Sequence, residues 1–468
     1  MENNSEKAVK SGAWYIVSNV LIRAVGIITA PLYTRLLTTS ESGYANNFNN
    51  YVSLITVVTC LCLIYSVGRA KIDFKDDFDG YMSSIQTLSS LFGLSVLILA
   101  MIFVPSEGIF GYNKLIVFIL FAYLVVYPSI DYMQYKYRFE YRYKENIAIS
   151  VIITAATVIL SVGLIYMMPQ DKGFAKILGT VIPSGAVALW CYFNLFKKGR
   201  TLYKKEYWKY ALKIGLPMIP HGLAMIILAR IDTSMISRMC SFSDVGLYTW
   251  GYTIGTLLMF ITNAIGQAWL PWFNERLNAG DRELIKEKNL LMMRAGCILT
   301  LGFILVTPEA VKILLARPYW ECMWVVPPVA LGTLCQYFYT NYVNQELFYK
   351  KTVMIAVNSI IAALINTGLN YVFIKKYGYA AAAYTTLAGY FILMCLHFIS
   401  TRFILKEKLY ADGRYFIMVI TVTAAGLLIM TQYDGLFGIA VRYILAIGLA
   451  IAFAFMFKDV IIKRILHK

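Results

Sequence analysis

The sequence predicts an all-α polytopic membrane protein with about 14 transmembrane helices, arranged as two pseudo-symmetric six-helix lobes followed by two C-terminal helices. Three observations lead to this prediction: an apolar composition, fourteen apolar segments of membrane-spanning length, and a weak internal repeat. The connections between the segments are too short to hold a soluble domain. Any function must therefore reside in the spans themselves.

The composition is far from that of a soluble protein. Of the 468 residues, 59% are hydrophobic and only 15% are charged, and the mean hydropathy is +0.62. The net charge of +17 could mark a nucleic-acid binder, but the basic residues fall in short clusters between apolar segments, where positive charge sets the topology. We therefore expect no nucleic-acid partner, and we interpret the Tyr-rich basic run 132–145 as an interfacial belt.

The apolar segments match the thickness of a membrane. A hydrocarbon core of about 30 Å needs roughly 20 residues of helix. By this measure the predicted spans are 12–37, 44–67, 81–104, 113–134, 147–167, 174–196, 210–237, 246–272, 289–307, 324–348, 353–374, 379–402, 414–431 and 437–457. The alternative is twelve spans, with two segments re-entrant or lying flat.

The distribution of basic residues predicts the topology. One set of alternate connections holds three times as many Lys and Arg residues as the other set. Cytoplasmic loops carry this excess. The assignment places both termini in the cytoplasm, which requires an even number of spans.

An internal repeat relates the start of the chain to its middle. TRLLTTSESGYANNFNNYVSLI, from Thr34, aligns with SRMCSFSDVGLYTWGYTIGTLL, from Ser237, at an offset of 203 residues. The offset maps spans one and two onto spans seven and eight, as in transporters whose lobes are related by an axis along the membrane normal. We expect matching turns at Gly43 and Gly246. The predicted domains are an N-terminal lobe at 1–200, a C-terminal lobe at 201–408 and two additional spans at 409–468.

Short motifs around the repeat resemble a known family. Pro217 and Pro220 in GLPMIP, Asp232 in RIDTSMI and SDVGLY at 243–248 are similar to the polysaccharide-transporter branch of the multidrug/oligosaccharidyl-lipid/polysaccharide exporter superfamily, the O-antigen and capsule-repeat flippases. The resemblance implies a flippase that moves an undecaprenyl-pyrophosphate-linked oligosaccharide across the bacterial cytoplasmic membrane by alternating access. It also implies membrane lipids, a glycan polymerase and chain-length machinery as partners of a monomeric protein.

Arginines inside the spans are candidates for binding the pyrophosphate, because an ionised group at the bilayer centre costs roughly 2.5–3.5 kcal/mol and rarely lacks a purpose. Arg23 lies near the middle of the first span, with Asn19 one turn earlier on the same face. A planar guanidinium suits phosphate oxygens. We assign this role to Arg23 and Arg230; a structural pairing of Arg23 with a carboxylate is the alternative.

Span seven combines prolines with ionisable groups. His221 and Asp232 share one face of the predicted helix, whereas Arg230 points the opposite way. Asp232 and His221 are candidates for binding a coupling ion, with structural hydrogen bonds or ion pairs as the alternative. Pro217 and Pro220 release backbone groups and should bend the helix as a gate.

Amide side chains form stripes that suit hydroxyl-rich ligands without a buried charge. The candidates for a glycan-facing cavity are Asn19, Asn263, Gln267, Gln336, Asn344, Asn358 and Asn366. The alternative is polar contact between helices, worth under about 1 kcal/mol each. Basic residues near the cytoplasmic ends are candidates for guiding an anionic headgroup inward: Arg69, Lys213 and Arg294.

The sequence contains no P-loop, no metal-ligand spacing and no nucleophile constellation. We therefore expect no enzymatic activity, no catalytic residue, no cofactor and no bound metal, with transport driven by the membrane potential or by a proton or sodium gradient. The nearest alternative is a cation-coupled small-molecule exporter of the same superfamily. A membrane glycan polymerase or glycosyltransferase is more distant, because such enzymes need a large external loop or acidic surface motifs.

Overall fold

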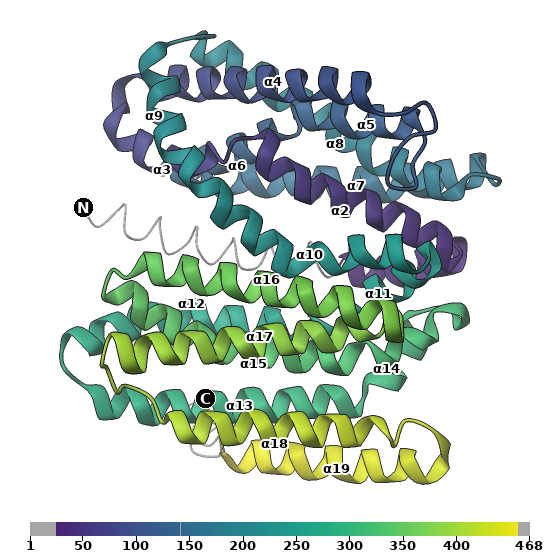
Figure 1. Cartoon of the computed structure of the whole chain (residues 1–468), viewed down its shortest axis with the longest axis vertical. Helices are drawn as coiled ribbons and strands as arrows, with labels where there is room; N and C mark the ends of the chain where they lie inside the picture. Colours follow the sequence, from purple (N-terminus) through teal and green to yellow (C-terminus); the bar gives the residue numbers. More distant parts are fainter. Residues whose placement is uncertain (1–24, 141, 457–468) are drawn as a thin grey trace, which may run out of the picture. The chain divides into compact units, whose positions relative to one another are not determined.

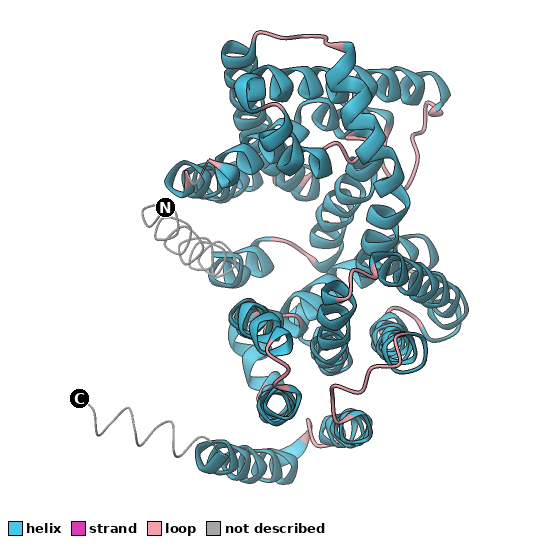
Figure 2. Cartoon of the chain, turned by 90° about the vertical axis from the view of Figure 1, so that its left-hand side faces the viewer, coloured by secondary structure: helices cyan, strands magenta, loops and turns pink. Residues whose placement is uncertain are grey.

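The computed structural model of the chain describes residues 25–140 and 142–456. Apart from an isolated bridge between Ile109 and Tyr112, every regular element in these residues is a helix (Figure 2). The predicted all-α class is confirmed. The chain divides into two compact units, Met1–Gly246 and Leu247–Lys468.

The first unit is a set of helices joined by short loops (Figure 1). A helix at 25–36 is followed by α2 (Thr39–Thr59), α3 (Ile64–Asp73), the short η1 (Lys75–Asp77), α4 (Phe78–Phe103), α5 (Lys114–Val126), α6 (Pro128–Phe139), α7 (Tyr143–Met167), α8 (Lys172–Gly199), α9 (Lys205–Gly215), η2 (Leu216–Met218) and α10 (Ile219–Met239). One buried cluster joins Leu61 and Leu63, between α2 and α3, to Ile130 of α6 and Tyr81 of α4. This core fixes α6 beside the break between α2 and α3.

The second unit is organised around one buried helix. Its elements are α11 (Phe242–Gly255), which begins in the first unit, α12 (Leu258–Asn278), α13 (Arg282–Leu305), α14 (Thr307–Leu314), η3 (Arg317–Trp324), α15 (Val326–Phe348), α16 (Thr352–Tyr377), α17 (Ala381–Ile399), η4 (Ser400–Ile404), α18 (Asp412–Met430) and α19 (Gly435–Met456). Most of α15 is buried, and it packs against α13, α17 and α18.

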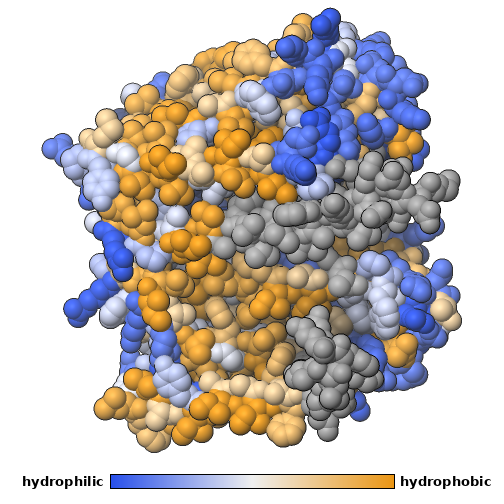
Figure 3. Space-filling model, turned by 180° about the vertical axis from the view of Figure 1, so that it is seen from behind, coloured by the Kyte–Doolittle hydropathy of each residue, from blue (hydrophilic) through white to orange (hydrophobic). Residues whose placement is uncertain are grey.

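The spans follow the prediction closely. Within the described residues, nine helices are long and apolar enough to cross a membrane, and two bent pairs raise the number to eleven. The pairs are α2 with α3, bent by 44°, and α11 with α12, bent by 40°. Predicted spans seven and ten are also helical but are not among these helices, and the first lies partly outside the described residues. Figure 3 shows broad hydrophobic areas along the helices, with hydrophilic side chains gathered toward the lateral edges.

The repeat is visible in the way two helices begin. Thr38 caps α2, because its hydroxyl accepts from the backbone N–H of Glu41 while the Glu41 carboxylate accepts from the Thr38 N–H. Ser241 and Asp244 exchange the same hydrogen bonds ahead of α11, at 3.1 and 3.2 Å. The same reciprocal capping box therefore starts both helices, at the predicted offset.

The predicted turns at Gly43 and Gly246 are wrong. Both glycines lie in the first turns of helices, α2 and α11. A Cβ added to Gly43 would overlap the carbonyl oxygen of Phe242, and one added to Gly246 would overlap that of Thr39. The glycines are therefore required by close backbone packing between helix starts, where the Thr39 and Ser243 hydroxyls also lie 2.7 Å apart.

Candidate functional site

A cavity of about 350 Å³ lies at the break between α2 and α3 in the first unit. The chain leaves the helix there because Leu61 and Cys62 adopt left-handed φ angles of 51° and 52°, which are uncommon for residues with a Cβ. Irregular backbone at membrane depth is tolerated where it is buried in protein or lines a cavity. This break meets that condition.

Four parts of the first unit line this cavity, which we call the Asp131 cavity. They are α2, the break with the start of α3, the start of α6, and α10. The lining residues are Val52, Ser53, Thr56, Val57, Cys60, Cys62, Ile64, Tyr65, Tyr127, Asp131, Gly222 and Ile226. Figure 1 shows α2, α3, α6 and α10 in this unit.

Asp131 carries the one carboxylate among the described residues that line the cavity. It lies in the first turn of α6, which begins at Pro128, and is half-buried. Within the described part of the chain its carboxylate makes no ion pair and no hydrogen bond. Among the described residues, no cation therefore balances the charge of an ionised Asp131.

The facing wall offers hydrogen-bond acceptors. The Ser53 hydroxyl donates to the Asn49 carbonyl at 3.0 Å, and the Thr56 hydroxyl donates to the Val52 carbonyl at 2.6 Å. Because these protons are used inside α2, the oxygen lone pairs remain to face a ligand. Together with the carboxylate, they make the cavity suited to a positively charged group.

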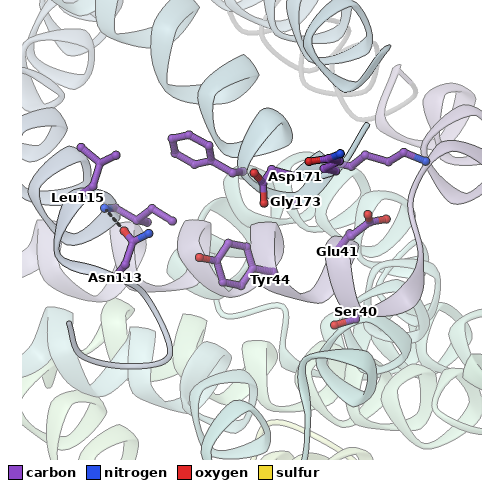
Figure 4. A pocket seen from close by; sticks show the side chains of 11 residues that line it. Ser40, Glu41, Tyr44, Asn113, Leu115, Asp171 and Gly173 are labelled. Carbon is purple, nitrogen blue, oxygen red and sulfur yellow. Dashed lines mark hydrogen bonds between the residues drawn. The ribbon is translucent and has the colours of Figure 1, made fainter. Parts of the chain in front are cut away.

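A second cavity, of about 360 Å³, lies where the start of α2 meets the start of α8, and we call it the α2–α8 pocket. Figure 4 shows Glu41, Tyr44 and Asp171 around it, and Asn113, whose side-chain oxygen accepts from the Ile116 N–H at 3.0 Å. Carboxylate, amide and phenol groups match the hydrogen-bonding groups of a sugar. The charge distribution predicts that this end of the helices is external.

The second unit contains a buried histidine–carboxylate pair. His397 of α17 and Glu346 of α15 are 1% and 0% exposed, and His397 Nδ1 donates to Glu346 Oε2 at 2.8 Å. The Asn358 amide of α16 donates to the Ser400 hydroxyl at 2.9 Å beside them, and Tyr339 stacks on the imidazole. The pair is enclosed by protein, so its first role is to hold three helices together.

The prolines of predicted span seven interrupt the helix as expected. Pro217 lies in η2, a three-residue 3₁₀ turn between α9 and α10, and Pro220 lies in the first turn of α10. Arg230 is exposed, whereas Asp232 is 1% exposed and accepts from the Thr233 N–H at 2.7 Å. The two charges therefore point apart, as predicted. Their binding and gating roles stay predictions.

The predicted glycan-facing amides divide into two groups. Asn366 is 1% exposed and donates to the Thr385 carbonyl at 3.0 Å, and Asn358 and Asn344 are also buried. Gln336 is half-buried and Asn263 is exposed. The buried amides form contacts between helices, the alternative that the sequence left open. Sugar binding by these residues stays a prediction.

Several predicted residues lie elsewhere or beyond the described part. Arg69, Lys213 and Arg294 are exposed, and Arg69 pairs with Asp73 at 3.0 Å. Arg23 and Asn19 lie outside the described residues, as do the side chains of His221 and Gln267. The described structure therefore leaves the pyrophosphate role of Arg23 as a prediction.

A family model described as a polysaccharide biosynthesis protein matches residues 8–276, which is more than half of the chain. The chain belongs to the polysaccharide biosynthesis protein family. The match confirms the predicted resemblance to a polysaccharide family. Protein 1 of the Lsg locus of Haemophilus influenzae is 22% identical to this polysaccharide biosynthesis protein, over 77% of the chain and 89% of the relative.

Solved structures show the same fold in transporters. The lipid II flippase MurJ, in an inward closed conformation, is similar with a TM-score of 0.70 at 13% identity, over 97% of this chain and 100% of that one. A multidrug resistance MATE family transporter in an inward-facing conformation is similar with a TM-score of 0.59 at 15% identity, over 82% and 93%. The polysaccharide biosynthesis protein described here is thus a multi-pass membrane protein that shares its fold with these two transporters.

The sequence did not single out Asp131 in this family member. The residue lies inside predicted span 113–134, one position before the Tyr-rich run interpreted as an interfacial belt. A carboxylate inside an apolar segment is a candidate site by default, so the signal was present. The other missed residue is Lys136, which belongs to the run 132–145 interpreted as an interfacial belt but is 2% exposed and paired with Asp79.

Proposed function

We propose that this transporter is a flippase for undecaprenyl-pyrophosphate-linked oligosaccharides, turning them from the cytoplasmic to the outer leaflet of the bacterial cytoplasmic membrane. The observation that carries the proposal is the match to the polysaccharide biosynthesis family over residues 8–276. The α2–α8 pocket supports it, because carboxylate and amide groups at an external site suit a glycan leaving the protein. Alternating access would then expose the substrate to each side in turn.

A cation-coupled exporter of small molecules is the second candidate function. The Asp131 cavity favours it, because a carboxylate with two neighbouring tyrosines could also accept an organic cation. We rank it lower because the MATE transporter covers 82% of this chain, whereas the lipid II flippase covers 97%. Because the lipid II flippase matches nearly the whole chain, the flippase proposal includes the C-terminal helices α18 and α19 in the transporter.

The proposal also covers the topology, the oligomeric state, the partners and the driving force. Both termini lie in the cytoplasm, the protein works as a monomer, and a glycan polymerase and chain-length machinery use its product on the outer side. A proton or sodium gradient, or the membrane potential, drives the cycle. Reporter fusions test the topology: a C-terminal green fluorescent protein should fluoresce, and a C-terminal alkaline phosphatase should be inactive.

The experiment that tests the function is flipping in proteoliposomes. Full-length protein is reconstituted with a fluorescent undecaprenyl-pyrophosphate oligosaccharide, and a membrane-impermeant glycosidase then reports the fraction exposed outside. We expect exposure to rise only in vesicles with protein. A MATE-type substrate such as ethidium serves as the second arm, and ethidium transport without glycan flipping would favour the exporter.

Arg23 offers a sharper test of substrate recognition. If its guanidinium binds the pyrophosphate, Arg23→Ala should abolish flipping and Arg23→Lys should retain part of it, because a lysine keeps the charge but not the planar donor pair. Arg35→Ala, at an exposed arginine twelve residues further along the chain, is the matched control. Unchanged flipping by Arg23→Ala would remove Arg23 from the site.

A further inference from the structure

We propose that the Asp131 cavity binds a small monovalent cation, a sodium ion or a proton, on the Asp131 carboxylate. The binding step stands on the geometry of the first unit alone. Its use as the coupling step of transport rests on the proposed function. The cation, rather than a residue of the protein, is the partner of Asp131.

The first argument is the absence of a protein partner. An ionised carboxylate inside a membrane protein is costly unless it is paired, and the cavity wall contributes no cation within the described residues. A proton would remove the charge, since it adds to a carboxylate oxygen and leaves a neutral acid. A sodium ion would balance the charge instead. Either ligand would remove the free-energy cost of an unpaired ionised carboxylate.

The second argument is the chemistry of the wall. The hydroxyl protons of Ser53 and Thr56 are donated to carbonyls within α2, so their oxygens face the cavity as acceptors. The thiols of Cys60 and Cys62 both point to the Val57 carbonyl, at 3.8 and 3.6 Å. The Ser53 and Thr56 oxygens therefore suit a hard cation, and the Tyr65 and Tyr127 phenols on the same wall can also turn an oxygen lone pair toward it.

The third argument concerns the other charged groups around the cavity. The titratable side chains that line it with Asp131 are Tyr65, Tyr127, Cys60 and Cys62. Of the charged side chains on the neighbouring helices, Arg69 pairs with Asp73 on α3, and Lys136 of α6 pairs with Asp79 of α4 and Glu140. Arg230 of α10, one turn beyond Ile226, is exposed. On α10, His221 precedes Gly222, but its side chain lies outside the described part. A pH experiment must therefore separate Asp131 from His221.

The cavity also joins two interrupted helices. Its wall includes the break between α2 and α3, and α10, which follows the proline turn η2. A Cβ added at Gly222 would lie 3.2 Å from Val57 Cγ1 and 3.4 Å from Cys62 Sγ, so α10 packs closely on the break. A cation bound at Asp131 would therefore lie beside both bends, the α2–α3 break and α10 after η2. Binding there would shift the equilibrium between conformations that differ at these bends, and so would bias the transport cycle.

The experiment measures cation binding by the purified full-length protein without any glycan. Thermal unfolding is followed in sodium chloride and in choline chloride of equal ionic strength, and then over pH 5 to 8. If sodium binds, the unfolding midpoint should rise with sodium by a few degrees at saturation, because the ligand stabilises the folded state. If a proton binds, sodium should have no effect and the midpoint should change with pH.

Variants test whether the change of the unfolding midpoint with sodium or pH arises at the Asp131 cavity. Asp131→Asn should remove the sodium response or the pH response, whereas Asp76→Asn, the same change at an exposed carboxylate of the first unit, should keep it. Thr56→Val, nearly isosteric, should weaken apparent sodium affinity about tenfold if its oxygen is a ligand, and should leave a proton response intact. His221→Asn should keep the response of Asp131.

Defined outcomes overturn the proposal. Wild-type protein that responds neither to sodium nor to pH overturns it, and this needs no variant to fold. A response that survives in Asp131→Asn, or that disappears in His221→Asn alone, also overturns it. Stabilisation by an organic cation, but not by sodium or protons, would assign the cavity to a small-molecule substrate. Because no glycan is present, failure of the flippase assay leaves the result unaffected.

Discussion

Two carboxylates, the buried Glu346 and the half-buried Asp131, lie in different units and have opposite surroundings. Glu346 is fully enclosed and paired with His397, whose imidazole is stacked on Tyr339. Asp131 borders a cavity and has no partner in the described part of the chain. Both lie in predicted spans, 113–134 and 324–348, where charge is costly. The difference shows that a partner makes a buried carboxylate structural, whereas an unpartnered one beside a cavity is available for binding.

The largest expected effect comes from breaking the buried pair. Glu346→Ala should lower the free energy of unfolding by about 3–5 kcal/mol, because it leaves His397 buried without its acceptor. Asp131→Ala should cost much less. Chemical unfolding in mild detergent measures both. Equal losses at the two sites would contradict the distinction between a paired and an unpaired carboxylate.

The next effect tests whether Glu346 and His397 act as a unit. Replacing both with leucine should cost less than the sum of the single replacements, with a coupling of about 0.5–3 kcal/mol, because two apolar groups of similar size leave no orphaned charge. A double-mutant cycle of unfolding free energies gives the coupling. Additive losses would show that the 2.8 Å contact contributes nothing of its own.

A smaller effect of opposite sign is expected at Asp131. Asp131→Asn should raise the free energy of unfolding by about 1 kcal/mol in sodium-free buffer at neutral pH, because it removes a charge that has no partner. The same variant should gain nothing at acidic pH if protonation already neutralises the wild type. Thermal unfolding at both pH values provides the measurement, and a loss of stability at neutral pH would show that the ionised carboxylate has a stabilising partner.

The smallest effect concerns a third carboxylate, Glu309 of α14, which lies outside the spans. Two hydrogen bonds from Arg442, each 2.7 Å, lower the pKa of Glu309 below its usual value of 4.5. Its contribution, about 1 kcal/mol or less, should therefore be present above pH 4.5 and lost as the pH falls through the lowered pKa. Glu309→Gln should be less stable than wild type at pH 7 and equal to it at low pH.

Local features of the chain could be predicted because they depend on neighbouring residues. Span positions follow from hydrophobic length, and every predicted segment from 44–67 onward coincides with a helix or a helix pair. The capping boxes at Thr38 and Ser241 follow from residues three positions apart. The turns expected at Gly43 and Gly246 failed because glycine also serves close helix packing, which depends on the distant Phe242 and Thr39 carbonyls.

The sequence by itself determined that the chain is an all-helical, multi-pass protein with a repeat, since apolar length and capping patterns are local properties. Only the tertiary structure decided which charges have partners. Glu346 and His397 are 51 residues apart and meet because α15 packs on α17. Among the described residues Asp131 lacks a cationic partner, because the segments of α2, α3, α6 and α10 that line its cavity bring no Lys or Arg to the wall. Charge pairing in a membrane depends on what distant segments bring together, and that information is absent from any single stretch of sequence.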